Sequence, residues 1–267
     1  MKAAIVGAGI GGLSAAIALA LRGWEVAVYE QAPALTEVGA GVQIAPNGMR
    51  VLDALGVTPG MAQTLFEPEA IEMRVGRSGR RVFRLPMRSE AQARWGARYI
   101  HIHRADLIAA LEARLNALAP GCITLGATVE GYTSASPARL RVNGAEVAAD
   151  LIVGADGLHS VFRQQMLGPE QPRYTGNLAW RAVVPTEALS SPPPPTACVW
   201  VGQGCHAVTT RLRAGSMVNF VGVVETPAPS EESWRQEGDR ADVAAVFGDW
   251  DASMAEVVAK APVFHRW

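Results

Sequence analysis

The first thirty residues show an apolar pattern typical of a strand, a helix and a second strand. Residues 3–6 form a short apolar run, as expected of a central parallel strand covered on both faces. Apolar residues then recur at helical spacing from Leu13 to Ala20, and Gly23 follows as a stop signal. Residues 25–30 predict a second strand with Val26 and Val28 apolar. This order predicts a βαβ unit.

Beyond this unit the pattern is mixed, and it changes again near Arg173. Asn143-Gly144 is a strong hairpin-turn signal between two short strands. Asn47 is expected to cap a helix that ends before Gly56. The expected helices are 47–55, 104–118, 158–167, 240–247 and 253–259. The expected strands are 71–76, 81–85, 101–103, 139–142, 145–148 and 150–154, followed by an antiparallel sheet of 178–184, 197–201, 206–212 and 217–224.

Composition narrows the class of protein. The chain has 267 residues, 49% hydrophobic and 18% charged, with a net charge of −1, which argues against a global footprint for nucleic acid. Eight arginines fall between Arg74 and Arg98, and we interpret them as a solvated hairpin face rather than an anion-binding patch. The uncharged stretch 3–21 contains four glycines, so it is interpreted as a strand, turn and helix, not a membrane span.

The cysteines indicate a reducing compartment. Cys122, Cys198 and Cys205 have no CxxC spacing and no even-numbered framework. We therefore expect a cytoplasmic protein without disulfides and without a metal site. The pattern makes no prediction about the oligomeric state.

A glycine-rich motif follows the first predicted strand. Gly7, Gly9 and Gly12 form a GxGxxG, in which the first permits a tight turn, the second lets a pyrophosphate approach and the third lets helix and strand pack closely. Glu30 ends the second strand, where a carboxylate can accept hydrogen bonds from ribose hydroxyls. The alternative is a glycine-rich turn with no ligand. The motif predicts a dinucleotide site and leaves FAD and NAD open.

A second motif lies far along the chain. Residues 150–163 predict a strand, an Asp156-Gly157 turn and a helix, with Ser160 and Arg163 in its first turn. Asp156 can reach a ligand's hydroxyls, and Gly157 tolerates a close backbone approach. The alternative is a capped helix with an exposed arginine.

Together these motifs resemble those of the group A FAD-dependent aromatic hydroxylases, which include salicylate, 3-hydroxybenzoate and 6-hydroxynicotinate monooxygenases. The resemblance rests on the GxGxxG with Glu30 and on Gly-Ala-Asp-Gly-x-x-Ser-x-x-Arg at 154–163. It extends to four further segments that are similar to the family's sequences, which are residues 39–47, 103–107, 179–181 and 219–225.

The resemblance implies an α/β fold, in which a Rossmann-like FAD domain of the glutathione-reductase type is interleaved with a mostly antiparallel β-sheet substrate domain. The FAD domain would comprise 1–70 and 98–171, and the substrate domain 71–97 and 172–267. Phe264 to Trp267 resemble the residues that lie just before a Gly-Asp-Ala-x-His-Pro segment in members of this family. This chain lacks that segment, so we expect a truncated protein with weaker FAD binding and impaired hydroxylation.

The resemblance also implies residue roles. Arg104 would contact FAD near its phosphates or ribityl chain, the alternative being a helix-start arginine that pairs with Asp106 or solvent. The backbone of Gly41, Val42 and Gln43 would line the isoalloxazine. Asp156 and Gly157 would serve both FAD and the transient nicotinamide.

His206 is the candidate catalytic base, because hydroxynicotinate-type relatives place a histidine on this strand and imidazole titrates near neutrality. The alternative is an ordinary strand histidine. A departure bears on this choice: Thr210-Arg211 stands where those relatives have a tyrosine, usually followed by proline.

The family's chemistry would use NAD(P)H as a transient electron donor, O₂, a C4a-hydroperoxyflavin and a small aromatic acid as substrate. Partners would be that substrate and O₂, with no nucleic acid and no membrane. Two rival readings remain. The same architecture serves halogenases and isoprenoid reductases, although the halogenase Trp-x-Trp-x-Ile motif is missing. A non-catalytic flavin-binding remnant is the other.

Overall fold

The computed structural model describes residues 1–35, 40–170, 173–227 and 236–267. They fall into two compact units: the first unit comprises Met1–Glu37, Leu52–Met61 and Ala105–Pro172, and the second Val38–Val51, Ala62–Arg104 and Arg173–Trp267. Gly39, in one of the segments that resemble the family, and the expected domain boundary at 171 and 172 lie outside the described residues. The division into a cofactor domain and a substrate domain stays a prediction.

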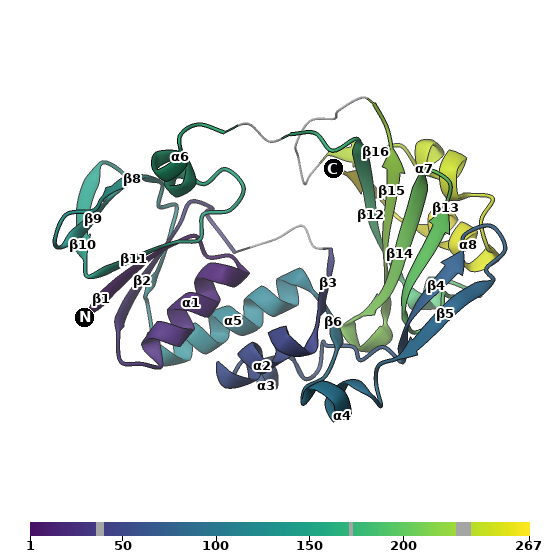
Figure 1. Cartoon of the computed structure of the whole chain (residues 1–267), viewed down its shortest axis with the longest axis horizontal. Helices are drawn as coiled ribbons and strands as arrows, with labels where there is room; N and C mark the ends of the chain where they lie inside the picture. The colour runs from purple at the N-terminus through teal and green to yellow at the C-terminus, as the bar shows by residue number, and fades with distance from the viewer. Residues whose placement is uncertain (36–39, 171–172, 228–235) are drawn as a thin grey trace. The chain divides into compact units, whose positions relative to one another are not determined.

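The first unit contains a parallel sheet. Strands β1 (Lys2–Val6), β2 (Glu25–Glu30), β7 (Ile123–Leu125) and β11 (Leu151–Gly154) pair in the order β11-β1-β2-β7. Helix α1 (Ile10–Ala20) packs against β1 and β2, and α5 (Arg104–Leu118) runs beside it (Figure 1). The predicted βαβ unit is therefore confirmed.

The other face of this sheet is covered by a second, smaller sheet. Strands β8 (Val129–Thr133), β9 (Ala138–Val142) and β10 (Ala145–Ala149) form an antiparallel meander. Ala4 and Val6 of β1 pack with Leu140, Val142 and neighbouring residues in one apolar cluster. The predicted turn joins β9 and β10, with positive φ at Asn143 (47°) and Gly144 (79°). Helix α6 (Val161–Leu167) follows β11.

The second unit is built on an eight-stranded sheet in the order β16-β17-β12-β15-β14-β13-β4-β5. Its strands are β4 (Ala70–Val75), β5 (Arg81–Pro86), β12 (Asn177–Pro185), β13 (Ala197–Gly202), β14 (Cys205–Leu212), β15 (Met217–Glu225), β16 (Glu237–Gly238) and β17 (Phe264–Arg266). All neighbouring pairs are antiparallel except β13 with β4. The prediction of a mostly antiparallel sheet is confirmed.

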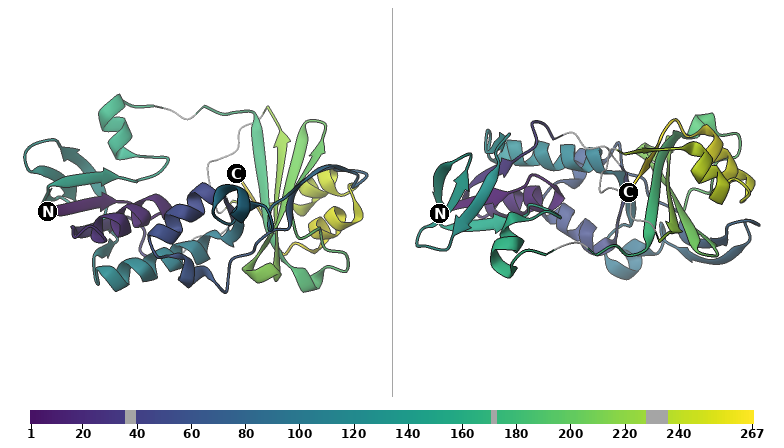
Figure 2. Two further views of the ribbon diagram at one scale, coloured as in Figure 1. Left: turned by 60° about the horizontal axis from the view of Figure 1, so that its bottom comes forward. Right: turned by 90° about the horizontal axis from the view of Figure 1, so that it is seen from above.

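The two faces of this sheet differ. Helices α7 (Arg240–Phe247) and α8 (Ala252–Lys260) cover one face, as Figures 1 and 2 show. Trp200, Phe220 and Phe247 are fully buried there. Because side chains alternate along a strand, the residues between them point to the opposite face. That face, called the open face below, carries the half-buried Val183, Val199, Val201, Val208, Val221 and Val223.

Short strands and helices make up the rest of the second unit and the segments that lead into and out of it. Strands β3 (Gly41–Ile44) and β6 (Ile100–His103) pair in antiparallel fashion. The short helices are α2 (Pro46–Ala54), α3 (Thr58–Met61), α4 (Ala91–Trp95) and the 3₁₀ turns η1 (Thr186–Ala188) and η2 (Arg213–Gly215). Helix α2 begins at Pro46, so the predicted capping role of Asn47 is wrong; proline is well suited to a first helical position.

The arginine-rich segment folds as the β4–β5 hairpin. Glu72 is 1% exposed and lies within 2.8 Å of Arg74 Nε, 2.9 Å of Arg84 Nη1 and 3.7 Å of Arg81 Nη1. Arg98 pairs with Glu67 and Arg94 with Glu90. Each of these five arginines thus contacts an acidic residue of the same unit, which favours a salt-bridged surface over a general anion-binding patch.

No helix in the described part of the chain is long and apolar enough to cross a membrane.

Candidate functional site

The glycine loop connects β1 to α1 at the carboxyl end of the parallel sheet. Gly7 has φ +97°, and a Cβ there would lie 2.3 Å from the carbonyl oxygen of Ala155. A Cβ on Gly12 would lie 1.8 Å from the carbonyl oxygen of Gly7. Around Gly9, by contrast, an added Cβ would meet nothing within 4 Å. The loop is packed where the helix meets the strand and open where a ligand could approach.

The N-terminus of α1 suits an anionic group. Gly9 is the N-cap, no side chain caps the helix, and its first turn holds no acidic residue. Free N–H groups and the helix dipole at such an end favour a phosphate. These features, together with the open space at Gly9, fit the pyrophosphate of a dinucleotide.

Glu30 lies beside this loop and holds it in place. Its Oε2 accepts a hydrogen bond from the Ala8 N–H at 2.7 Å, and its Oε1 accepts one from the Ala32 N–H at 2.9 Å. An ionised carboxylate has about four acceptor positions, so both oxygens can accept further bonds from ribose hydroxyls. The predicted ligand role is compatible with this loop-bracing role.

The Asp156-Gly157 turn meets the glycine loop because β1 and β11 are adjacent and parallel. Val6 pairs with Gly154, and a Cβ on Gly7 would lie 3.3 Å from the Cα of Asp156. Gly157 has φ +76° and open space around it. Two motifs about 150 residues apart are therefore brought to one sheet edge, the position at which parallel α/β sheets bind ligands.

Asp156 also organises the helix that follows. Its Oδ1 accepts a bond from the Ser160 hydroxyl at 2.7 Å, and its Oδ2 accepts one from the Phe162 N–H at 3.3 Å. Ser160 in turn caps α6 by accepting from the Arg163 N–H at 3.0 Å. The capped helix considered as the alternative therefore exists, and it orients the carboxylate rather than removing it from use.

In the second unit, the predicted flavin-lining segment forms β3. Gly41, Val42 and Gln43 pair with His103, Ile102 and His101 of β6. Arg104, the first residue of α5, donates its N–H to the Ala40 carbonyl at 3.2 Å. The pairing brings the predicted residues Gly41 and Arg104 to the same end of this two-stranded element.

Two residues that sequence reasoning missed hold β3. The Asn219 side chain accepts the Gly41 N–H at 3.0 Å, and a Cβ on Gly41 would lie 3.1 Å from that side chain. The Tyr99 hydroxyl donates to Gln43 Oε1 at 2.5 Å, and burial raises the pKa of Tyr99 to about 12. Asn219 lies in one of the segments that resemble the family, but no local pattern in the sequence indicates a contact with Gly41, 178 residues away, or one between Tyr99 and Gln43, 56 residues apart.

His206 lies on the open face near the β13–β14 turn. It pairs in register with Val201 and Val223, and its side chain is exposed. A shallow cavity of about 330 Å³ includes His206, Val199, Val223 and Glu225 in its lining. The predicted base is accessible and stands at the margin of an apolar floor.

A more enclosed cavity of about 250 Å³ lies elsewhere on the open face. Its lining includes His103, Arg181, Arg213, Asn219 and His265. Burial, and next the positive charge of Arg104, lower the pKa of Arg181. The guanidinium groups of Arg181 and Arg213 favour an anionic ligand such as a carboxylate or phosphate in this cavity, called the cationic cavity below.

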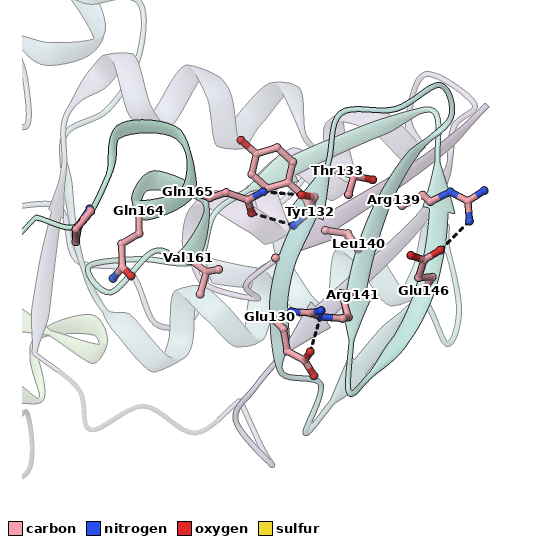
Figure 3. Close-up of a pocket in the computed structure, with 12 residues that line it drawn as sticks. Glu130, Tyr132, Thr133, Arg139, Leu140, Arg141, Glu146, Val161, Gln164 and Gln165 are labelled. Carbon is pink, nitrogen blue, oxygen red and sulfur yellow. Dashed lines mark hydrogen bonds and ion pairs between the residues drawn. The ribbon is translucent and has the colours of Figure 1, made fainter.

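A cavity of about 550 Å³ lies in the first unit between the β8–β9 surface and α6 (Figure 3). Arg139 pairs with Glu146 and Arg141 with Glu130 across its walls. None of the predicted site residues lines it. Its volume alone therefore does not make it the reaction site.

Thiol and metal chemistry have little support within the described residues. Burial raises the pKa of Cys122, Cys198 and Cys205, to about 12 for Cys198, so these groups are protonated thiols near neutral pH. Among residues that the structure describes, no group of three or more His, Cys, Asp or Glu side chains could hold a metal ion.

The fold and the loop geometry define a dinucleotide-binding α/β protein. A family model described as an FAD binding domain matches residues 1–249. The chain is 38% identical over 269 residues to 3-amino-4-hydroxybenzoate 2-monooxygenase of Streptomyces cremeus, covering 100% of this chain and 66% of that protein. It is 30% identical over 271 residues to 6-hydroxynicotinate 3-monooxygenase of Bordetella bronchiseptica, covering 100% of this chain and 70% of the relative.

Solved structures of other proteins share the fold of this chain. Klebsiella pneumoniae HpxO, solved with FAD and uric acid, superposes with a TM-score of 0.85 at 28% identity, covering 100% of this chain and 67% of that one. A salicylate hydroxylase in complex with substrate shares the fold, with a TM-score of 0.78 at 22% identity and coverage of 100% and 67%. The chain therefore belongs to the FAD binding domain family, as the motifs indicated. It spans about two thirds of the length of these relatives.

Proposed function

We propose that this chain binds FAD and contributes to the NAD(P)H-dependent hydroxylation of a small aromatic acid. The observation that carries the proposal is the meeting of the glycine loop and the Asp156-Gly157 turn at the carboxyl edge of β1 and β11. The names of relatives support this substrate class, since they specify hydroxylated benzoates and a hydroxynicotinate.

The chain's own residues would hold the cofactor as follows. The α1 N-terminus behind Gly9 would receive the pyrophosphate, and Glu30 would accept from ribose hydroxyls. Asp156 and Gly157 would approach the same ligand from β11. Gly41, Val42 and Gln43 would present their backbone to the isoalloxazine, and Arg104 would neutralise phosphate charge.

The substrate would lie on the open face of the large sheet. Half-buried valines provide an apolar floor for a ring, while Arg181 and its neighbours in the cationic cavity would attract a carboxylate. A charge-assisted bond between guanidinium and carboxylate would orient the ring. FAD, when bound, supplies acceptance of hydride from NAD(P)H and activation of O₂ for transfer to an electron-rich ring.

His206 would accept the phenolic proton of the substrate through an imidazole nitrogen. Removing that proton makes the ring more electron-rich, and a positioned base of this kind contributes roughly 10²–10⁴-fold to a rate. Its side chain is exposed and lines the 330 Å³ cavity on the open face.

The test combines FAD titration with NADH and NADPH oxidation in the presence of 3-amino-4-hydroxybenzoate, 3-hydroxybenzoate or 6-hydroxynicotinate, with product detection. We expect bound FAD and ring-dependent oxidation that yields a hydroxylated product. His206→Gln should lower kcat at least about 100-fold while FAD affinity is retained, whereas Gln203→Ala on the adjacent exposed turn should not. FAD binding without turnover for any aromatic acid would instead favour a non-catalytic flavin-binding protein.

A further inference from the structure

The carboxylate of Asp156 is tied to a short helix. Helix α6 has seven residues, of which only Phe162 is a buried hydrophobic residue. Asp156 is held by the Ser160 hydroxyl and by the Phe162 N–H, both in the first turn of α6 or its cap. Any tilt of α6 therefore moves the two donors that orient the carboxylate.

Gln165, one turn further along α6, fastens the helix to the edge of β8. Its Nε2 donates to the Tyr132 carbonyl at 2.6 Å, and its Oε1 accepts from the Tyr132 N–H at 3.1 Å, as the dashed lines of Figure 3 show. β8 is an edge strand of its sheet. The amide thus makes the pair of bonds that a neighbouring strand residue would make.

The same helix face makes a second contact with β8. Phe162 lies three residues before Gln165, so both side chains point the same way. Its ring stacks on Tyr132 with centroids 4.8 Å apart and planes inclined by 10°. Phe162 also packs on β11, because a Cβ on Gly154 would lie 2.9 Å from its ring. The stack limits the distance of α6 from the sheet, and the two directional bonds of Gln165 limit its rotation.

We propose that Gln165 is a positioning residue for the cofactor site: its two-bond attachment to Tyr132 fixes α6 and thereby orients the Asp156 carboxylate. The proposal rests on the proposed function, in that Asp156 is taken as an FAD contact. Gln164 offers a matched control. Gln164 and Gln165 both line the 550 Å³ cavity between α6 and the β8–β9 surface. Unlike that of Gln165, the side chain of Gln164 makes no hydrogen bond within the described part of the chain.

The first test removes the attachment and measures local order and FAD affinity. Gln165→Met keeps the length of the side chain without its hydrogen bonds. Gln165→Glu retains an acceptor for the Tyr132 N–H but has no donor for the carbonyl. We expect Gln165→Met to raise amide hydrogen exchange of residues 158–163 and the Kd for FAD by about tenfold each. Gln165→Glu should fall between, and Gln164→Met should match the wild type.

A double-mutant cycle separates positioning from general support of the fold. If Gln165 acts through Asp156, Gln165→Met should change the Kd for FAD by less than about twofold in an Asp156→Asn background, while still raising exchange. An equal loss of affinity in both backgrounds would overturn the positioning role. Unchanged exchange in Gln165→Met would overturn the attachment itself, whether or not FAD binds.

The outcomes also separate this proposal from the proposed function. If wild type binds FAD and Gln165→Met binds it equally well, only the positioning role fails. If wild type binds no FAD, the proposed function fails and the cofactor role of Gln165 falls with it, while the exchange data still decide whether Gln165 fixes α6.

Discussion

His101 makes the folded protein sensitive to mild acid. Its side chain is 0% exposed, with the Phe66 and Tyr99 rings 6.1 and 5.6 Å away between centroids. Burial lowers the pKa of His101 from 6.5 to about 4, and a main-chain group of Arg211 opposes this only in part. The folded state thus holds a neutral imidazole over a range in which the unfolded chain takes up a proton.

The sign and size of the effect follow from linkage. Between pH 6.5 and about 4 the unfolded state binds more protons, so the free energy of unfolding falls as the pH falls. At 1.36 kcal/mol per pKa unit, the full difference is about 3 kcal/mol. By pH 5.0, about 2 kcal/mol of this should be lost relative to pH 7.5.

Urea unfolding of the wild type and of His101→Phe at pH 7.5 and 5.0 measures this loss in the free energy of unfolding. Other groups titrate in both proteins, so the difference between their pH dependences isolates His101. We expect the wild type to lose about 2 kcal/mol more than His101→Phe. Equal losses in wild type and His101→Phe would refute the argument that burial keeps this imidazole neutral.

Three further substitutions test the packing. Gly12→Ala places a Cβ 1.8 Å from the Gly7 carbonyl oxygen, so we expect lost FAD binding and a lower melting temperature by calorimetry; normal binding would contradict the loop geometry. Glu72→Ala removes a buried carboxylate from three partly exposed arginines and should cost about 1.5–3 kcal/mol in urea unfolding, against less than about 1 kcal/mol for the half-exposed Glu69→Ala. Phe247→Ala opens a cavity under the large sheet and should cost about 3–5 kcal/mol, and a loss below 1 kcal/mol would show that α7 does not seal this core.

Features with local causes were predictable from the sequence. Asn143-Gly144 forms the expected turn because both residues tolerate positive φ. The GxGxxG loop is likewise set by steric limits within a few residues, and its strand, turn and helix occur where the pattern places them. The helix expected from Leu158 instead begins at Val161, because Ser160 serves as its cap.

Features with distant causes were not predictable from the pattern. The Gly41 N–H bonds to the Asn219 side chain 178 residues away, and the parallel pairing of β13 with β4 joins segments more than 120 residues apart. Burial of Glu72 likewise depends on three arginines that converge only in the folded hairpin. A single sequence shows strand propensity but not strand partners, so the open face and the cationic cavity emerge only from the fold.

We propose that the glycine loop and the Asp156-Gly157 turn, which meet at the carboxyl edge of β1 and β11, form one FAD site. Titrating the purified chain with FAD, followed by flavin absorption and by ultrafiltration, tests it most directly. We expect a saturable, perturbed flavin spectrum that is retained with the wild-type protein and is lost in Gly12→Ala. Free FAD passing the filter with an unperturbed spectrum in wild type, or identical retention by wild type and Gly12→Ala, would contradict it.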